Sequence, residues 1–439
     1  MRGQVPPPTF GEALRFWLKL GFISFGGPAG QIAVMHQELV DRRGWISESR
    51  FLHALNYCML LPGPEAQQLA TYLGWLMHRT LGGIVAGALF VLPSLLILIG
   101  LSWIYAAWGS QPLIAAMFWG IKPAVTAIVL HAAWRIGSRA LGNGLLRAIA
   151  VAAFAAIFVL DVPFPAIIAG AALLGHLGGR LLPGRFLAGT GHAEHGANGT
   201  AIDDEAPAHT RFRWPRLAAV VAIGLLLWSL PLAALTLAFG WEHLLTQTGW
   251  FFTKAALLTF GGAYAVLPYV HQGAVEHYGW LSAAQMIDGL ALGETTPGPL
   301  IMVVAFVGFI AAWNHAIFGP DALFAAGAAA ALLATWFTFL PSFLFILAGG
   351  PLVESTHGRQ GFAAPLSAIT AAVVGVIVNL ALFFAGHVFW PQGLAGPVDA
   401  GAMAIAVIAA IALFRFKRGV IEVIAACAAA GVASGLLAG

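Results

Sequence analysis

Long, uninterrupted runs of apolar residues constrain the fold of this chain more than any other feature. Four of them are Leu81–Ala107, Leu217–Phe239, Ala322–Ala348 and Ile421–Leu437, and each is long enough to cross about 30 Å of hydrocarbon as a helix. Strands of a membrane barrel would alternate between apolar and polar residues, and these runs do not. Only 9% of the 439 residues are charged, too few to cover the surface of a soluble protein. The sequence therefore predicts an all-α polytopic membrane protein.

Polar breaks between the apolar runs divide the chain into about thirteen predicted transmembrane segments. Cytoplasmic loops carry an excess of Lys and Arg. With a cytoplasmic N-terminus most Arg residues fall inside, whereas Arg42, Arg43 and Arg50 fall outside and argue against this orientation. Thirteen crossings of a cytoplasmic (inner) membrane then place the C-terminus outside. The segments lie near residues 12–36, 51–78, 81–107, 111–134, 145–160, 163–179, 217–239, 247–271, 285–313, 322–349, 363–388, 399–415 and 419–438.

Several classes of function are not expected. Cys58 and Cys427 allow at most one disulfide and form no metal-ligand cluster, so we expect neither a metal nor a cofactor. The net charge of +3 is too small to indicate nucleic-acid binding. The chain has no P-loop, no zinc-protease motif, no dinucleotide fingerprint and no paired nucleophile and base. The expected partners are the lipid bilayer and a small ligand rather than an enzyme substrate, and the oligomeric state, a homodimer included, stays open.

The two halves of the chain repeat each other. Residues 16–64 match residues 251–299 at an offset of 235 without a gap, and Leu92-Pro93-Ser94 matches Leu340-Pro341-Ser342 at an offset of 248. The second half therefore carries a short insertion. The first segment and its mate are seven crossings apart, and an odd number means that they run in opposite directions. An inverted repeat of this kind is typical of secondary transporters, whose binding site lies between the halves near the membrane midplane.

The repeat also sets the expected domain boundaries. We predict an N-terminal repeat over residues 1–183 and a C-terminal repeat over residues 216–439, the latter with one extra leading helix. The long polar stretch 184–215 between them is expected to be an interdomain loop. A plain linker without a function of its own is the simplest interpretation of that stretch.

Four short breaks interrupt apolar segments, two in each half. Backbone freed from helix inside a membrane is tolerated chiefly where it lines an enclosed or watery cavity. Proline suits the first position of a helix, and the unpaired N–H groups of a helix start attract anions. The alternative is a proline kink or close glycine packing, but paired breaks in register favour half-helices. The breaks are Gly26-Gly27-Pro28, Pro62-Gly63-Pro64, Gly261-Gly262 and Pro297-Gly298-Pro299.

Three of the four lysines, Lys19, Lys122 and Lys254, lie inside apolar segments. A cation there costs about 2.5–3.5 kcal/mol on insertion scales, so a functional role is the default hypothesis. Lys19 is close enough to the start of its segment to reach the headgroups instead. However, Lys254 occupies the matching place in the repeat, seven residues before its Gly-Gly pair. We therefore predict that Lys19 and Lys254 help to bind an anion. Lys122 has no repeat mate, and the alternative role for it is to neutralise a buried carboxylate.

Two carboxyl groups, Glu65 and Glu294, stand close to the breaks and are not repeat mates. Either is a candidate for coupling proton movement to transport. The alternatives are a first-turn Glu that complements the helix dipole, for Glu65, and an ion-pair partner of a lysine, for Glu294. Neutral hydrogen-bonding groups that we predict to line the same site are Ser24, Gln67, Thr259 and Thr296.

Taken together, these motifs resemble the chromate ion transporter family in its long, two-domain form. The resemblance covers most of the chain except 184–215, and the motifs recur in order in both halves. In the second half Ala263 stands where the first half has proline. The motifs are Phe25-Gly26-Gly27-Pro28, Gln31, Leu61-Pro62-Gly63-Pro64, Gly82-Gly83 and Leu92-Pro93-Ser94 in the first half, and Thr259-Phe260-Gly261-Gly262, Trp280 and Thr296-Pro297-Gly298-Pro299 in the second.

The resemblance implies a secondary active transporter that exports chromate from the cytoplasm, is driven by the proton-motive force and confers chromate resistance. Sulfate, also a tetrahedral dianion, is the expected competitor or second substrate. Two alternatives stay open, a carrier that takes up sulfate or another oxyanion and an anion channel of the same fold. The glycines and prolines of the four breaks are the family motif residues that carry over.

Overall fold

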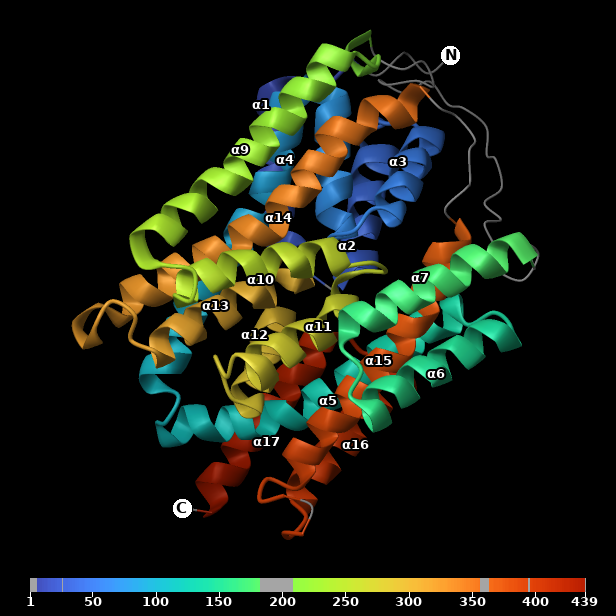
Figure 1. The fold of residues 1–439 in the computed structure, drawn as a ribbon. Helices are drawn as coiled ribbons and strands as arrows, with labels where there is room; N and C mark the ends of the chain where they lie inside the picture. The colour runs from blue at the N-terminus through green and yellow to red at the C-terminus, as the bar shows by residue number, and fades with distance from the viewer. Residues whose placement is uncertain (1–5, 26, 182–207, 356–362, 394, 439) are drawn as a thin grey trace.

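The computed structural model describes residues 6–25, 27–181, 208–355, 363–393 and 395–438. Regular structure in these ranges is helical, and no strand occurs in them (Figure 1). Seven of the helices are long and apolar enough to cross a membrane, whereas α6 (Gly144–Leu160), α13 (Val303–Asn314) and α16 (Ala400–Phe414) are shorter and apolar. The all-helical membrane fold is thus confirmed, while the count of thirteen crossings is not. The seven are α4 (Glu65–Trp108), α5 (Pro112–Ala140), α7 (Phe164–Leu181), α9 (Trp214–Phe239), α14 (Leu323–Ser355), α15 (Ala363–Phe389) and α17 (Val420–Ala438).

The segments that contain the breaks are pairs of short helices, not single crossings. Segment 12–36 consists of α1 and α2, which have 14 and 10 residues and are about 21 and 15 Å long. Neither is long enough to cross 30 Å of hydrocarbon alone. Short helices also make up the other segments that contain breaks. The short helices next to the breaks are α1 (Phe10–Ile23), α2 (Gly27–His36), α3 (Glu48–Leu60), α10 (Leu244–Leu258), α11 (Ala263–His271) and α12 (Ala283–Thr295).

The repeat extends to details of the backbone. The π-helical turn η1 (Gln37–Arg42) recurs as η3 (Gln272–His277), at the offset of 235 found in the sequence. Gly44 and its mate Gly279 both have a φ of 60°. Because a π-helical turn is rare, its recurrence at the matching place supports two halves of one structural design.

Helix α4 is a hairpin of two antiparallel helices. Its backbone leaves the helical region at His78 and Arg79, where the φ of Arg79 is 56°. A Cβ added to Gly83 would lie 2.9 Å from the carbonyl oxygen of Thr71. Residues twelve positions apart would be separated by about 18 Å in a straight helix, so the chain must reverse between them. Glycine permits this close approach of the two arms.

The two halves interlock. Helix α5 of the first half packs against α16 and α17 of the second, and α15 of the second half packs against α6 and α7 of the first (Figure 1). Small residues allow close contact in both places, since an added Cβ on Gly120 would meet Gly431 at 2.8 Å and one on Gly375 would meet Phe154 N at 3.0 Å. Reciprocal packing of this kind is what a two-fold relation between the halves produces.

Candidate functional site

The four breaks meet in the middle of the fold and pair across the two halves. Gly298 N donates to the carbonyl oxygen of Ser24 at 2.8 Å, and Gly63 N donates to that of Thr259 at 2.7 Å. The two donors, Gly63 and Gly298, are repeat mates 235 positions apart, and so are the two acceptors, Ser24 and Thr259. Each half therefore satisfies backbone groups that the breaks of the other half set free. We call these two hydrogen bonds the crossing.

Side-chain amides strengthen the crossing. The Nε2 of Gln31, which is 1% exposed, donates to the carbonyl oxygens of Gly298 at 2.5 Å and Ser24 at 3.4 Å. Gln68 Nε2 donates to the carbonyl oxygen of Pro62 at 2.8 Å. Gln31 lies on α2 and Gln68 on α4, so helices of the first half hold both parts of the crossing.

Helices begin at the breaks, as the sequence predicted. Helix α2 begins at Gly27, directly before Pro28, and α4 begins at Glu65 with Pro64 as its N-cap residue. Helix α11 begins at Ala263 after Gly262, which has a φ of 96°, so the missing proline does not prevent a helix start there. The Pro299 break leads first into a 3₁₀ turn, η4 (Leu300–Met302), and then into α13.

Three of these helix starts converge on one cavity of about 940 Å³, which we call the central pocket. Each helix start presents unpaired N–H groups and a partial positive charge. Figure 1 shows α2 and α11 near the middle of the molecule. The pocket is lined by Pro28 of α2, Glu65 of α4, Gly262 and Tyr264 at the start of α11, and Arg135 and Arg139 at the end of α5.

Arg135 is the cation of the central pocket that faces a break. A Cβ added to Gly27 would lie 3.7 Å from Nη2 of Arg135. The Arg135 side chain is half-buried, and among the described residues its guanidinium has neither an ion-pair nor a hydrogen-bond partner. An Arg presents five N–H donors in a planar fork that suits an oxyanion. Arg135 is therefore available to a bound ligand.

Acidic groups also border the central pocket. Tyr264 donates a hydrogen bond from its hydroxyl group to Glu294, and Glu65 Oε1 lies near Gly262. At the outer end of the pocket His36 binds Glu48 through Nε2 at 2.6 Å and Asp41 through Nδ1 at 3.4 Å. The charges of Glu48 and Asp41 are thereby directed to His36.

The predicted lysines lie outside the central pocket. The Lys19 side chain is exposed on α1. Lys254 lies over the Trp250 ring, 5.7 Å from its centroid, and lines a separate cavity of about 490 Å³ with Asp161 and Glu276. The structure thus does not bring the two lysines together, and their role in binding stays a prediction.

Of the other predicted residues, some line the central pocket or belong to the crossing, and others are bound within their own segments. Gly261 lines the pocket together with Gly262, and Thr296 is buried with its hydroxyl group donating to the carbonyl oxygen of Gly293 at 3.0 Å. Gln67 is buried in α4 and donates to Thr71 at 3.0 Å. Pro297 is buried beside Gly298. Gly26 lies outside the described residues, as does most of the expected loop, of which the structure describes 208–215.

Arg135 is a functional candidate that the orientation argument treats as a loop charge. It stands five residues inside the end of an apolar helix. An Arg within such a helix is a candidate functional residue by the same argument that was applied to the lysines. The reciprocal pairing of the breaks had no signal in the sequence, because the repeat shows which residues are equivalent and not which residues touch.

Comparisons with known proteins agree with the resemblance seen in the motifs. The family model described as "Chromate transporter" matches residues 11–176 and 246–432. The chain is 33% identical to a chromate transport protein of Pseudomonas aeruginosa, covering 85% of this chain and 80% of that one. It is 28% identical to a chromate transport protein of Cupriavidus metallidurans, covering 94% and 90%. It is also 28% identical to a probable chromate transport protein of Synechococcus elongatus, covering 85% and 84%.

No solved structure matches the chain. The family model covers both halves of the chain and leaves out the predicted interdomain loop. It describes membrane transporters rather than enzymes, which agrees with the long apolar helices of this fold. The chain therefore belongs to the chromate transporter family and is a multi-pass membrane protein.

Proposed function

We propose that this protein carries chromate across the membrane and binds it in the central pocket, between the N-termini of α2 and α11 and the guanidinium of Arg135. The observation that carries the proposal is an Arg that lies beside two helix starts in one cavity and has neither an ion-pair nor a hydrogen-bond partner in the described part of the chain. Helix starts bind anions through N–H groups and the helix dipole, and a guanidinium adds two parallel hydrogen bonds to an oxyanion. The names of the relatives supply the identity of the anion.

The two repeats border the central pocket in unequal surroundings, which supports alternating access. Every residue of α11 is buried, whereas Gln31 and Met35 are the buried residues of its repeat mate α2. The same contrast holds for the mates α12 and α3. Helix α12 is buried throughout 286–293, whereas only some residues of α3 are buried. Two equivalent halves in unequal surroundings can exchange their arrangements. We infer that rocking of one repeat against the other closes the pocket along α2 and opens it along α11.

We further propose that the direction is export and that the proton-motive force drives it. Glu65 and Glu294 are candidate proton carriers, because both border the pocket region and an ionisable group inside a membrane protein is a functional candidate. Export of this kind from a cytoplasmic membrane would confer chromate resistance.

The topology that we propose keeps the N-terminus in the cytoplasm and the C-terminus outside, with the two repeats inverted. The two-fold pairing of the breaks supports equivalent halves. An inverted pair differs from a parallel pair in that its two-fold axis lies in the membrane plane. Sulfate has the charge and the shape of chromate, so we also propose that it competes for the same pocket.

Uptake of labelled chromate into inside-out membrane vesicles tests the proposed function. We expect accumulation above the outside concentration when a proton gradient is imposed, and unlabelled sulfate should reduce it. Vesicles from cells without the protein serve as the control. An anion channel would equilibrate chromate without accumulating it, and an uptake carrier would accumulate it in right-side-out vesicles instead. Equal accumulation of chromate with and without the proton gradient would show that proton-driven export is wrong.

A further inference from the structure

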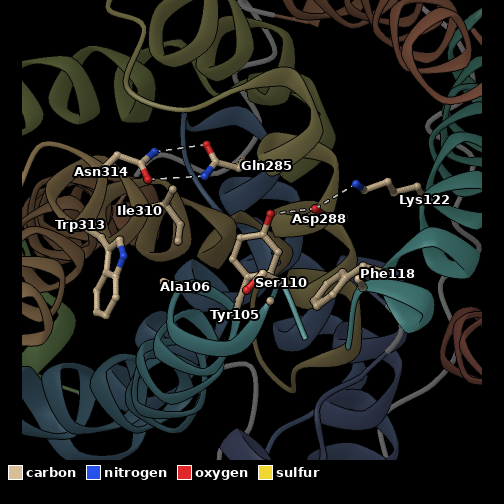
Figure 2. Close-up of a pocket in the computed structure, with 12 residues that line it drawn as sticks. Tyr105, Ala106, Ser110, Phe118, Lys122, Gln285, Asp288, Ile310, Trp313 and Asn314 are labelled. Carbon is tan, nitrogen blue, oxygen red and sulfur yellow. Dashed lines mark hydrogen bonds and ion pairs between the residues drawn. The ribbon is translucent and has the colours of Figure 1, made fainter. Parts of the chain in front are cut away.

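Another cavity, besides the central pocket and the one beside Lys254, contains charged side chains that the proposed function does not use. It has a volume of about 300 Å³ and lies among α4, α5, α12 and α13, and we call it the lateral pocket. Figure 2 shows Tyr105, Lys122 and Asp288 pointing toward one another in it, with Gln285 and Asn314 nearby. None of these residues lines the central pocket.

Asp288 is the centre of this group and has an unused oxygen. The residue is 2% exposed. Its Oδ2 accepts a hydrogen bond from the hydroxyl group of Tyr105 at 2.8 Å and lies 3.4 Å from Nζ of Lys122. Its Oδ1 is buried and has no hydrogen-bond partner among the described residues. A buried polar atom without a partner is costly, so such an atom needs an explanation.

The surroundings of Asp288 hold one compensating charge. Helix α12 packs against α4, α5, α13, α15 and α17. In the described part of these helices, the charged or titratable groups that contact Asp288 are Lys122 of α5 and Tyr105 of α4. Gln285 and Asn314 in the same pocket are neutral and bind each other, with Asn314 Nδ2 donating to Gln285 Oε1 at 3.2 Å. Formation or loss of charge on Asp288 therefore acts directly on Lys122.

The Lys122–Asp288 pair has no counterpart in the repeat, because Asp288 corresponds to His53 and Lys122 to Thr370. At the offsets of 235 and 248, Gln285 corresponds to Arg50 and Ala106 to Glu354. Arg50 Nη1 and Glu354 Oε2 form an ion pair at 2.7 Å with both side chains nearly fully buried, and Tyr72 donates a further hydrogen bond to Glu354. That ion pair is closed, whereas the Lys122 side chain is 30% exposed in the lateral pocket. Protons from solution can reach Asp288 through the pocket.

We propose that Asp288 is a proton-binding site of the transport cycle and that Lys122 is its partner in the unprotonated state. The proposal rests on the proposed function, since it supplies the coupling of that function. A proton forms a bond with Oδ1 of Asp288, the carboxylate becomes neutral, and Lys122 loses its counter-charge. A proton fits this site better than a metal ion, because Ca²⁺ and Mg²⁺ require about six oxygen ligands and Lys122 repels a cation at this distance.

The two helices that hold this pair also reach the central pocket. Helix α5 carries both Lys122 and Arg135, which are thirteen residues and about 20 Å apart along the helix. Helix α12 carries both Asp288 and Glu294, the partner of Tyr264. Breaking the Lys122–Asp288 pair therefore loosens α5 against α12 and can shift Arg135 relative to the start of α11. This is a physical link between a proton site and an anion site.

Two transport assays on the full-length protein in liposomes separate coupling from binding. The first measures exchange of labelled chromate or labelled sulfate at equal pH on both sides, which needs no net proton movement. The second measures accumulation driven by a gradient of one pH unit at zero membrane potential, where each coupled proton supports about tenfold accumulation. The variants are Asp288→Asn and the double variant Asp288→Asn/Lys122→Gln, which leaves no unpaired charge. Asp321→Asn, at an exposed position, is the matched control.

We expect both Asp288 variants to keep exchange within about threefold of wild type and to lose gradient-driven accumulation, a loss of about tenfold. The control should behave as wild type in both assays. If Asp288→Asn is not recovered as folded protein, the double variant carries the test. Wild-type accumulation in a folded variant would overturn the proton site while leaving the proposed function intact, and loss of exchange would assign Asp288 to structure or anion binding instead. Absence of oxyanion exchange by wild type would overturn both.

Discussion

Single glycines make the crossing of the two halves possible. Gly298 has a φ of 98°, and an added Cβ would lie 2.9 Å from Cβ of Ser94. Residues with a side chain rarely adopt this backbone conformation, and forcing one to do so costs about 1–3 kcal/mol. The same residue donates the hydrogen bond to Ser24. A side chain at position 298 would therefore strain the backbone that donates this hydrogen bond and weaken the contact between the halves.

We predict that Gly298→Ala lowers the melting temperature of the purified protein and reduces transport, because the strain of about 1–3 kcal/mol falls on the crossing. Gly170→Ala is the matched control: Gly170 lies in α7, and an added Cβ there would meet no heavy atom within 4 Å. Alanine in a helix interior stabilises by up to about 1 kcal/mol relative to glycine. Thermal unfolding followed by fluorescence measures both variants. An equal melting temperature for Gly298→Ala and wild type would contradict the assigned backbone.

Residue-level reasoning from the sequence succeeded where a residue type has one strong physical reason for its place. Pro28 and Pro64 marked the helix starts of α2 and α4, whereas Pro299 leads into a 3₁₀ turn and α11 begins without a proline. Lysine was a weaker guide, because the long side chain of Lys19 can remain exposed on its helix. Which cation faces the breaks depends on the position of the α5 end relative to Gly27, which is set by tertiary packing.

At the level of elements, the reversal within α4 shows why hydropathy alone miscounts this fold. A window over Glu65–Trp108 finds one long apolar helix, whereas the chain turns back at His78 and Arg79. The sequence did separate 51–78 from 81–107, because Arg79 is charged. It did not foresee that the two arms touch through Gly83. Periodicity predicts that helices exist, but close glycine contacts fix how they pair.

We predict that Gly83→Val destabilises the hairpin of α4 by about 1–3 kcal/mol, the usual cost of overpacking a filled interface. An added Cβ at this position would lie 3.0 Å from Cβ of Trp75 on the other arm. Gly100→Val on the same helix is the control, since an added Cβ there meets no heavy atom within 4 Å. Size-exclusion profiles and melting temperatures should separate the two variants. Equal stability of both would refute the antiparallel contact.

On the scale of the whole molecule, the halves form one structure rather than two domains joined by a linker. Helix α5 packs on α16 and α17 while α15 packs on α6 and α7, and backbone hydrogen bonds cross between the breaks in both directions. The repeat predicted from the sequence explains the two-fold character of these contacts. The packing of helices of one half against helices of the other could not be predicted. A sequence repeat is compatible with two halves that pack separately as well as with two halves that pack into each other.

This arrangement places the central pocket where elements of both halves meet. Arg135 and the start of α2 come from the first half, and the start of α11 comes from the second. A dianion bound there contacts both repeats at once, so movement of one repeat against the other changes its surroundings. We therefore propose that a tetrahedral oxyanion binds beside Arg135.

Equilibrium binding of labelled chromate to the purified full-length protein tests this claim most directly. We predict saturable binding to wild type and a dissociation constant raised about 10- to 100-fold in Arg135→Gln, since a hydrogen bond to a charged group contributes about 1.5–3 kcal/mol. Arg180→Gln, an exposed position at the end of α7, is the matched control and should bind as wild type does. Equal affinity of Arg135→Gln and Arg180→Gln, both folded, would contradict the account.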